Sequence, residues 1–245
     1  MATAQEPRLD AWRRDGFFIV RGVFVETQLA ALAQACDHVL AQVRAALPES
    51  GHSSTHIAGL FAPEYFCDRP GLLAELVNFA SSRAVIDLVH DLGRPLEGEL
   101  NLRDAHYFHE PSARDRDGDW HRDGDLVASA ALLAMADRRP TSLRYRVALA
   151  PDDHLEIVPG SHRRADTPEE LRMRRGPLRN GALGGGPVRL ALQPGDVCVF
   201  DTWSIHRGRY RCGSLRRTLD LLFGFGPRAG RDFSQLLKYV LSRES

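Results

Sequence analysis

The sequence of 245 residues contains almost no lysine. Lys238 is the single lysine among 32 basic residues, and the remainder are arginines. These are balanced by 32 acidic residues, so the formal net charge is zero. Without an excess of positive charge, the chain has no general electrostatic attraction to nucleic acids or anionic membranes. We attribute the arginine bias to genome composition and predict neither kind of partner.

Cysteine and long apolar runs are also scarce. The four cysteines lack CxxC spacing, so they indicate neither a disulfide framework nor a thiolate metal site. No apolar run approaches membrane-spanning length, and the amino terminus lacks the basic and apolar regions of a signal peptide. We therefore expect a soluble cytoplasmic protein.

Apolar residues make up 43% of the chain, enough for a sizeable core. Before residue 95, apolar residues recur mainly at steps of three and four, which predicts helices. After it, alternation and Gly- or Pro-containing turns predict strands. The predicted helices cover 8–15, 26–47, 72–77, 84–92, 167–175 and 232–241. The predicted strands cover 17–20, 100–111, 143–149, 155–158, 188–192, 197–200 and 218–225. Residues 52–69 fit either a lid over a site or an ordered surface loop.

Helices followed by many short strands predict a mainly β fold with flanking helices, in which a β-sandwich is braced by the amino-terminal helices. No internal repeat or linker is visible, so we predict one domain. Its parts would be helical support at 1–95, a β core at 96–228 and a carboxyl-terminal helix at 229–245.

The residues most suited to chemistry are in the segment WHRDG at 120–124. His121 and Asp123 are two positions apart, so in an extended segment they point to one side and can bind one ion. His206, 83 residues after Asp123, would supply a third ligand. Two imidazoles and a carboxylate leave three adjacent positions of an octahedral metal open, as non-haem iron(II) oxygenases require. The same residues could also hold a zinc ion for hydrolysis, or persist in a non-catalytic binding protein.

Four segments resemble the phytanoyl-CoA dioxygenase family of iron(II)/2-oxoglutarate enzymes, and they occur in that family's order. They are DGFFIVRGVF at 15–24, WHRDG, LEIVPGSH at 155–162, and LQPGDVCVF at 192–200 leading to His206. The resemblance covers most of the chain and implies a double-stranded β-helix, the jelly roll of cupin-like proteins. The chain departs from the family at 207–211, where RGRYR replaces a small polar run. The resemblance therefore does not identify the substrate.

The resemblance implies that the three ligands hold Fe(II), and that 2-oxoglutarate and O₂ are co-substrates. It further implies oxidation of an unactivated C–H bond of a small molecule, usually by hydroxylation. Iron halogenases of the family lack a carboxylate at the position of Asp123, because chloride binds there. Its presence favours hydroxylation, desaturation or cyclisation.

The co-substrate would contact residues on two further strands. By family spacing, Arg217, 11 residues after His206, would pair with the distal carboxylate of 2-oxoglutarate, since the planar guanidinium suits bidentate contact. Arg216 would then point to the opposite face of the strand. His106, on the strand-like stretch that begins at Leu100 and reaches Pro111, would either bond the co-substrate or be a core or rim histidine with its own partner.

Two charged groups bear on the substrate. Arg144 and Arg146 share one face of a strand; we expect that face to be solvated, whereas an inward face would bind an anion. Residues 104–125 contain seven carboxylates and three arginines, a local charge of −4. This segment is either a solvated turn or a negative rim that attracts a cationic substrate, such as an amine or amino sugar intermediate of natural-product synthesis.

Overall fold

The computed structural model describes residues 6–46, 55–93, 100–111, 114–123 and 142–225. The strands are β1 (Phe17–Val20), β2 (His56–Ala58), β3 (Leu100–His109), β4 (Arg116–Asp117), β5 (Ser142–Ala148), β6 (Asp152–Ile157), β7 (Val188–Leu192), β8 (Val197–Asp201), β9 (His206–Tyr210) and β10 (Arg217–Phe225). The helices are α1 (Glu6–Asp15), α2 (Glu26–Ala46), α3 (Pro70–Ala80), α4 (Arg83–Gly93) and α6 (Pro168–Arg175), with 3-10 turns η2 (Pro63–Phe66) and η3 (Ser161–Arg163).

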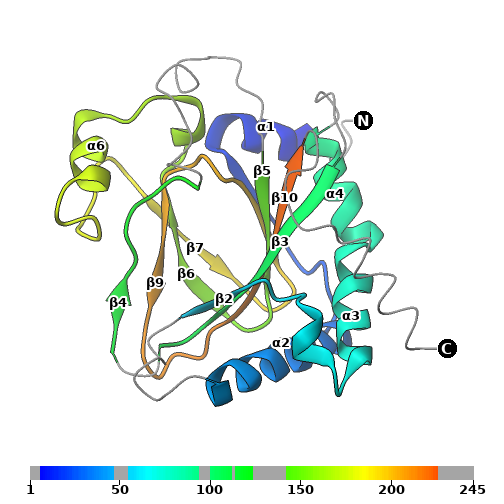
Figure 1. The fold of residues 1–245 in the computed structure, drawn as a ribbon. Coiled ribbons are helices and arrows are strands. Elements are labelled where there is room, and N and C mark those ends of the chain that lie inside the picture. Colours follow the sequence, from blue (N-terminus) through cyan, green and yellow to red (C-terminus); the bar gives the residue numbers. More distant parts are fainter. Residues whose placement is uncertain (1–5, 47–54, 94–99, 112–113, 124–141, 226–245) are drawn as a thin grey trace.

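The strands form two antiparallel sheets that face each other (Figure 1). The larger has the order β1-β8-β5-β10-β3-β2 and the smaller the order β4-β9-β6-β7. From β3 onwards the chain passes repeatedly from one sheet to the other, which is the connectivity of a jelly roll. The predicted double-stranded β-helix is therefore confirmed. β1 and β2 come from the first 95 residues, so that part of the chain contributes strands as well as helices.

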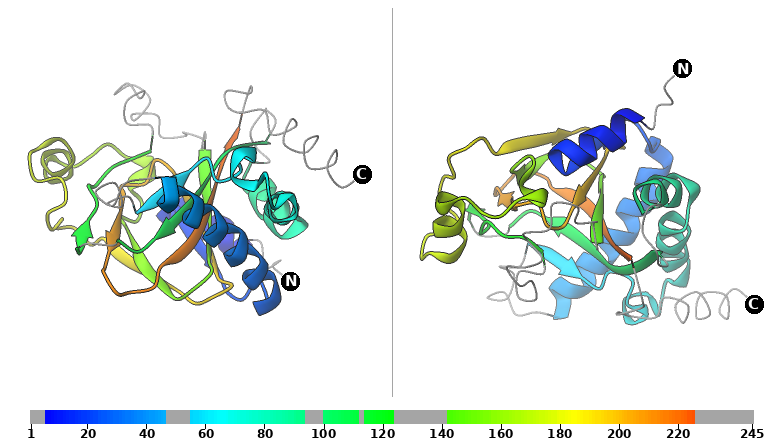
Figure 2. Two further views of the ribbon diagram at one scale, coloured as in Figure 1. Left: turned by 60° about the horizontal axis from the view of Figure 1, so that its bottom comes forward. Right: turned by 90° about the horizontal axis from the view of Figure 1, so that it is seen from above.

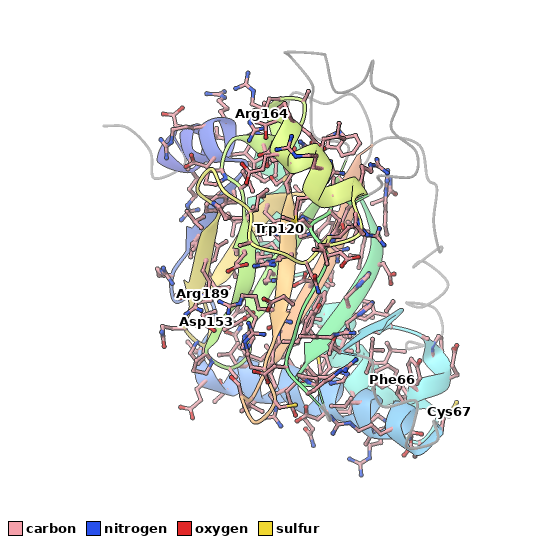
Figure 3. All side chains as sticks on the ribbon, turned by 90° about the vertical axis from the view of Figure 1, so that its left-hand side faces the viewer. Phe66, Cys67, Trp120, Asp153, Arg164 and Arg189 are labelled. Carbon is pink, nitrogen blue, oxygen red and sulfur yellow. The ribbon has the colours of Figure 1, made fainter. Side chains whose placement is uncertain are left out.

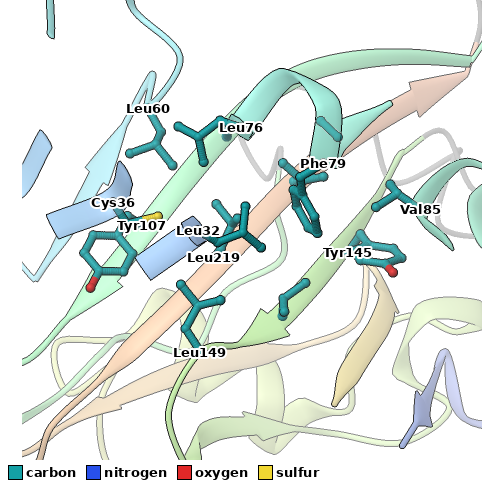
Figure 4. Close-up of a cluster of buried hydrophobic side chains, with 14 of the residues drawn as sticks. Leu32, Cys36, Leu60, Leu76, Phe79, Val85, Tyr107, Tyr145, Leu149 and Leu219 are labelled. Carbon is teal, nitrogen blue, oxygen red and sulfur yellow. The ribbon is translucent and has the colours of Figure 1, made fainter. Parts of the chain in front are cut away.

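The outer face of the six-stranded sheet is apolar and is covered by helices α2, α3 and α4 (Figure 2). Side chains of a strand alternate between faces, and on β10 the outward positions are Leu219, Leu221 and Phe223. Figure 4 shows part of the resulting cluster. The strands contribute Tyr107, Tyr145 and Leu219. These side chains lie with those of helices α2 (Leu32, Cys36) and α3 (Leu76, Phe79). This cluster is the main core of the protein.

The inner face, which looks towards the smaller sheet, is only partly apolar. A second cluster lies between the sheets and includes Leu155, Ile157 and Phe200. Several of the other inward positions carry charge: Arg146 is buried and donates two hydrogen bonds of 2.7 Å to Asp220. The expectation of a solvated face for Arg144 and Arg146 was therefore wrong, because this face looks towards the smaller sheet and both guanidinium groups are paired with carboxylates.

The segment predicted as a lid or surface loop has a different role. His56–Ala58 forms strand β2, which pairs with the edge of β3, and Phe61 and Phe66 are buried in the main core. Residues 52–54 of that segment and the predicted helix at 232–241 lie outside the described residues. Among the described helices, none is long and apolar enough to cross a membrane.

Candidate metal centre

The two segments that carry the predicted ligands are joined through their backbones. His121 and His206 form an isolated antiparallel bridge, with each N–H donating to the other residue's carbonyl at 3.0 Å. Two residues further on, the N–H of Asp123 donates to the carbonyl of Thr202 at 2.8 Å. Main-chain pairing therefore brings together residues that are 79 and 85 positions apart.

The side chains of His121, Asp123 and His206 converge on one point. Each offers one ligand atom, and these atoms lie within 4.8 Å of one another. Nε2 of His121 is 3.5 Å from Oδ1 of Asp123, and Nε2 of His206 is 3.7 Å from the same oxygen. Two ligands at about 2.1 Å from a metal and at right angles lie about 3 Å apart, so a small contraction would close this set around a cation.

Backbone carbonyls fix the orientation of both imidazoles. Nδ1 of His121 lies 2.8 Å from the carbonyl oxygen of Asp119, and Nδ1 of His206 lies 2.8 Å from that of Ser204. A carbonyl oxygen only accepts hydrogen bonds, so Nδ1 carries the proton in each ring. The lone pair is then on Nε2, which faces the common point, as in metal-ligating histidines generally.

The three groups differ in burial and protonation. Burial, reinforced by the charge of His121, lowers the pKa of His206 to about 3, and only 7% of its side chain is exposed. The side chain of His121 is 45% exposed; burial lowers its pKa, but the hydrogen bond and charge of Asp123 outweigh this and raise it. Burial opposes ionisation of Asp123, yet Arg144 and the two histidines hold its pKa well below the usual range. At neutral pH the set therefore contains a neutral His206 and an ionised carboxylate.

Arg144 holds the second oxygen of the carboxylate ligand. Its Nε donates to Oδ2 of Asp123 at 2.7 Å, while Oδ1 faces the histidines. Asp123 therefore presents one oxygen to the common point. Sequence reasoning did not find this contact, because Arg144 was expected on a solvated face.

The two arginines at the start of β10 lie on the faces opposite to those predicted. Arg217 points outward, where Nη2 is 2.5 Å from Oδ2 of Asp37 on α2, and its side chain is 36% exposed. Arg216 is buried, with its guanidinium 5.0 Å from the ring centre of Phe108 and 4.9 Å from that of Tyr210. Its Nε and Nη2 have no hydrogen-bond partner among the described residues. The orientation expected of Arg217 was wrong, and Arg216 is the inward residue.

His106 lies on the inner face of β3, in register with Asp220 of β10. Nε2 of His106 is 3.2 Å from Oδ2 of Asp104, and its ring stacks on that of His56 at 5.9 Å. It therefore shares the face of Arg144 and Arg146, and it is already paired with a carboxylate.

The acidic segment at 104–125 is neutralised by arginines from elsewhere in the chain. Arg211 contacts Asp117 at 2.6 Å and Asp115 at 3.9 Å, and Arg179 contacts Asp119 at 3.3 Å. The RGRYR run thus supplies counter-charges to its neighbour β4. Within the described part of the segment, these carboxylates are therefore paired with arginines and do not form an uncompensated negative rim.

Trp120 anchors the chain immediately before His121 (Figure 3). The indole is buried, and its Nε1 donates to the carbonyl of Gly181 at 3.0 Å. The guanidinium of Arg207 lies 4.4 Å from its ring centre. A second residue of the RGRYR run therefore supports the ligand-bearing segment.

A jelly roll with two histidines and a carboxylate converging between its sheets defines the class of non-haem metal proteins with a three-residue facial ligand set. The phytanoyl-CoA dioxygenase (PhyH) family model matches residues 12–218, and the chain belongs to this family. Family and fold together are those of non-haem iron, 2-oxoglutarate-dependent enzymes.

Several solved structures share the fold. AviO1 from Streptomyces viridochromogenes Tue57 is 20% identical with a TM-score of 0.66, over 94% of this chain and 100% of that one. The epimerase SnoN from nogalamycin biosynthesis is 19% identical with a TM-score of 0.63, over 91% and 84% of the two chains. EctD from S. alaskensis, with 2-oxoglutarate and 5-hydroxyectoine, is 21% identical with a TM-score of 0.63, over 95% and 82%. No curated protein sequence matches the chain significantly.

Proposed function

We propose that this protein uses Fe(II), 2-oxoglutarate and O₂ to oxidise a small molecule. The observation that carries the proposal is the convergence of two Nε2 atoms and one carboxylate oxygen within 4.8 Å, with both imidazole tautomers set for metal binding. Two nitrogens and one oxygen on one side of an octahedral ion suit Fe(II) and leave room for a chelating co-substrate.

His121, Asp123 and His206 would hold the iron, and the bound iron with O₂ would supply the oxidising power. The protein's own contribution is to set the ligands before the ion arrives. Arg144 keeps Asp123 ionised and engages its outer oxygen, so the carboxylate would occupy one coordination position. This leaves the remaining positions for the co-substrates.

For the distal carboxylate of 2-oxoglutarate we propose Arg216, in the role that the family spacing assigned to Arg217. Nε and Nη2 of Arg216 form one edge of the guanidinium, the edge by which Arg146 binds Asp220. A buried donor without a partner costs about 1–3 kcal/mol, and a carboxylate would satisfy both donors of this edge at once. His106, on the same inner face, is proposed as an additional co-substrate contact.

We propose hydroxylation of a C–H bond as the outcome, since Asp123 supplies the carboxylate that halogenation lacks. Epimerisation is the second candidate, because SnoN is an epimerase and shares the fold. The EctD structure contains 5-hydroxyectoine, and SnoN comes from nogalamycin biosynthesis. These two neighbours support a polar natural-product intermediate as substrate.

The test begins without oxygen. Fe(II) and 2-oxoglutarate added together to the purified protein should produce the weak visible charge-transfer band of a metal–keto acid chelate, and His206→Ala should not produce it. With oxygen, the wild type should release succinate, and a candidate substrate should raise that release above the uncoupled rate. A gain of one oxygen atom in the product identifies hydroxylation, whereas an isomer of unchanged mass identifies epimerisation. No band with Fe(II), together with hydrolysis supported by Zn(II), would contradict the proposal.

A further inference from the structure

We propose that Arg122 is a positioning residue that holds the two ligand-bearing segments in register. The inference rests on the proposed function, because it assumes that His121, Asp123 and His206 bind a metal. Arg122 lies between the first two of these ligands. In an extended segment the middle side chain points away from its neighbours, so Arg122 projects away from the metal centre into the protein.

The guanidinium of Arg122 is fully buried, with 0% of its side chain exposed. Nη1 donates to the carbonyl of Ser161 at 2.8 Å and also to the carbonyl of Trp203. Nε and Nη2 donate to Oδ1 of Asp166 at 3.1 and 2.7 Å, and Nη2 also reaches the carbonyl of Arg164 at 3.3 Å. One side chain therefore binds two separate stretches of backbone, residues 161–164 and the turn at Trp203, together with a counter-ion.

Both stretches bear on the position of His206. Trp203 belongs to the turn that leads directly into His206. The N–H of Trp203 donates to Oδ1 of Asp201 at 2.8 Å. Ser161 contacts the same turn from the other side, where its Oγ accepts a hydrogen bond from the N–H of Ile205 at 2.8 Å. By donating hydrogen bonds to the carbonyls of Ser161 and Trp203, Arg122 links the HxD segment to the turn that carries the third ligand.

The counter-ion connects this arrangement to helix α6. Asp166 accepts hydrogen bonds from Arg122 and also pairs with Arg174 of that helix. The helix itself begins with a capping box formed by Thr167 and Glu170. The positive charge of Arg122 is thus neutralised in a buried site with a well-anchored partner. Lysine would keep the charge, but a single ammonium cannot reproduce the fork that spans these acceptors.

A structural role and a positioning role predict different results. If Arg122 only stabilises the fold, its replacement lowers the thermal midpoint and leaves the metal site unchanged in the protein that remains folded. If it positions the ligands, the folded variant binds metal more weakly and with altered geometry. Groups that orient metal ligands without binding the metal themselves typically contribute about 10- to 100-fold to metal affinity.

The experiment titrates the apo-protein with Co(II) under argon at a temperature where every variant is folded. Calorimetry gives the dissociation constant, and the visible d–d bands report the coordination geometry. We expect Arg122→Gln to raise the Co(II) dissociation constant by about 10- to 100-fold and to change the spectrum. Arg122→Lys should recover only part of the affinity.

Arg174→Gln is the matched control. It removes the second arginine that pairs with Asp166 but leaves the contacts of Arg122 with Ser161 and Trp203 in place. We expect it to lower the thermal midpoint while the Co(II) dissociation constant stays close to that of the wild type. His206→Ala, which should bind no Co(II) in this range, defines the loss of the site.

A folded Arg122→Gln protein with the wild-type dissociation constant and spectrum would overturn the inference. If that variant does not fold, Asp166→Asn decides instead: it removes the counter-ion that orients Arg122, so we expect weaker Co(II) binding, and unchanged binding would overturn the inference. Failure of the wild type to bind Co(II) would overturn the proposed function and this inference with it. Wild-type binding alongside an unaffected Arg122→Gln would overturn this inference alone.

Discussion

The two faces of the six-stranded sheet have opposite characters although they are built from the same strands. On β10 the outward residues Leu219 and Leu221 are buried against helices, whereas the inward Thr218 and Asp220 are buried among polar groups. Burial of apolar surface on the outer face stabilises the fold. Burial of charge on the inner face does not, because desolvation offsets much of the Coulomb attraction of a pair such as Arg146 and Asp220. We infer that one face maintains the structure and the other carries the chemistry.

The largest effect should come from the metal ligands, one of which, Asp123, contacts Arg144 on the inner face. His121→Ala or His206→Ala should abolish turnover, because two remaining ligands hold iron weakly and in the wrong geometry. Neither change removes core packing, so circular dichroism should show a folded protein. Succinate release by each iron-loaded variant measures the effect, and wild-type turnover would remove that histidine from the proposed site.

Arg216→Ala tests whether the co-substrate is bound on the inner face of the sheet and not on the outer face. Truncating one partner of a buried, hydrogen-bonded charge pair costs roughly 2–5 kcal/mol, which corresponds to about 30- to several-thousand-fold in affinity. The apparent 2-oxoglutarate constant should rise by that factor, with Co(II) binding near normal. Arg217→Ala is the control on the outer face, where loss of a half-exposed pair with Asp37 should cost at most about 1 kcal/mol of stability. A large co-substrate defect in the Arg217 variant alone would restore the assignment by family spacing.

Leu219→Ala tests the outer face. Truncation of a fully buried leucine should lower the free energy of unfolding by about 2–5 kcal/mol, because it removes apolar contacts and leaves a cavity. A shift of the urea midpoint measures this loss. Co(II) affinity, measured where the variant is folded, should be unchanged. Weaker metal binding would mean that the two faces are not functionally separate.

The smallest expected effect is the pH dependence of metal affinity. The pKa of His121 is raised, so metal must displace its proton, and the apparent affinity should fall as pH drops through that pKa. The pKa of His206 is about 3 and that of Asp123 is also low, so neither should release a proton near neutrality. Calorimetry in buffers of different ionisation enthalpy should count about one proton per Co(II) below the pKa of His121. A count of two would mean that His206 is also protonated there.

Much of the fold and the ligand set could be predicted from the sequence. The apolar residues of α2 recur with helical period, and the alternation in β5 marks a strand, because both patterns reflect burial on one face. The convergence of His121 and Asp123 follows from their spacing in an extended segment. The pairing of His121 with His206 required the family resemblance, since no local pattern reports a contact across 85 residues.

The face of Arg217 could have been predicted and was not. Counting from His206 selects Arg217, but alternation places it with Leu219, Leu221 and Phe223, which face the helices. Arg216 alternates with Thr218 and Asp220 on the inner face. The sequence offers no comparable signal for Arg144 or Arg122, because their partners depend on the packing of segments that are distant in the chain.

The position of β1 has a consequence for synthesis of the protein. Among the described strands, β1 pairs with β8 alone, with Phe17 opposite Phe200, so the two paired strands are separated by nearly the whole β-rich part of the chain. At about 5–20 residues per second, a ribosome needs on the order of 10–35 seconds after making β1 to make β8. During that interval the apolar strand Phe17–Val20 has emerged before the partner it needs. The first strand of this jelly roll is therefore among the last to be paired.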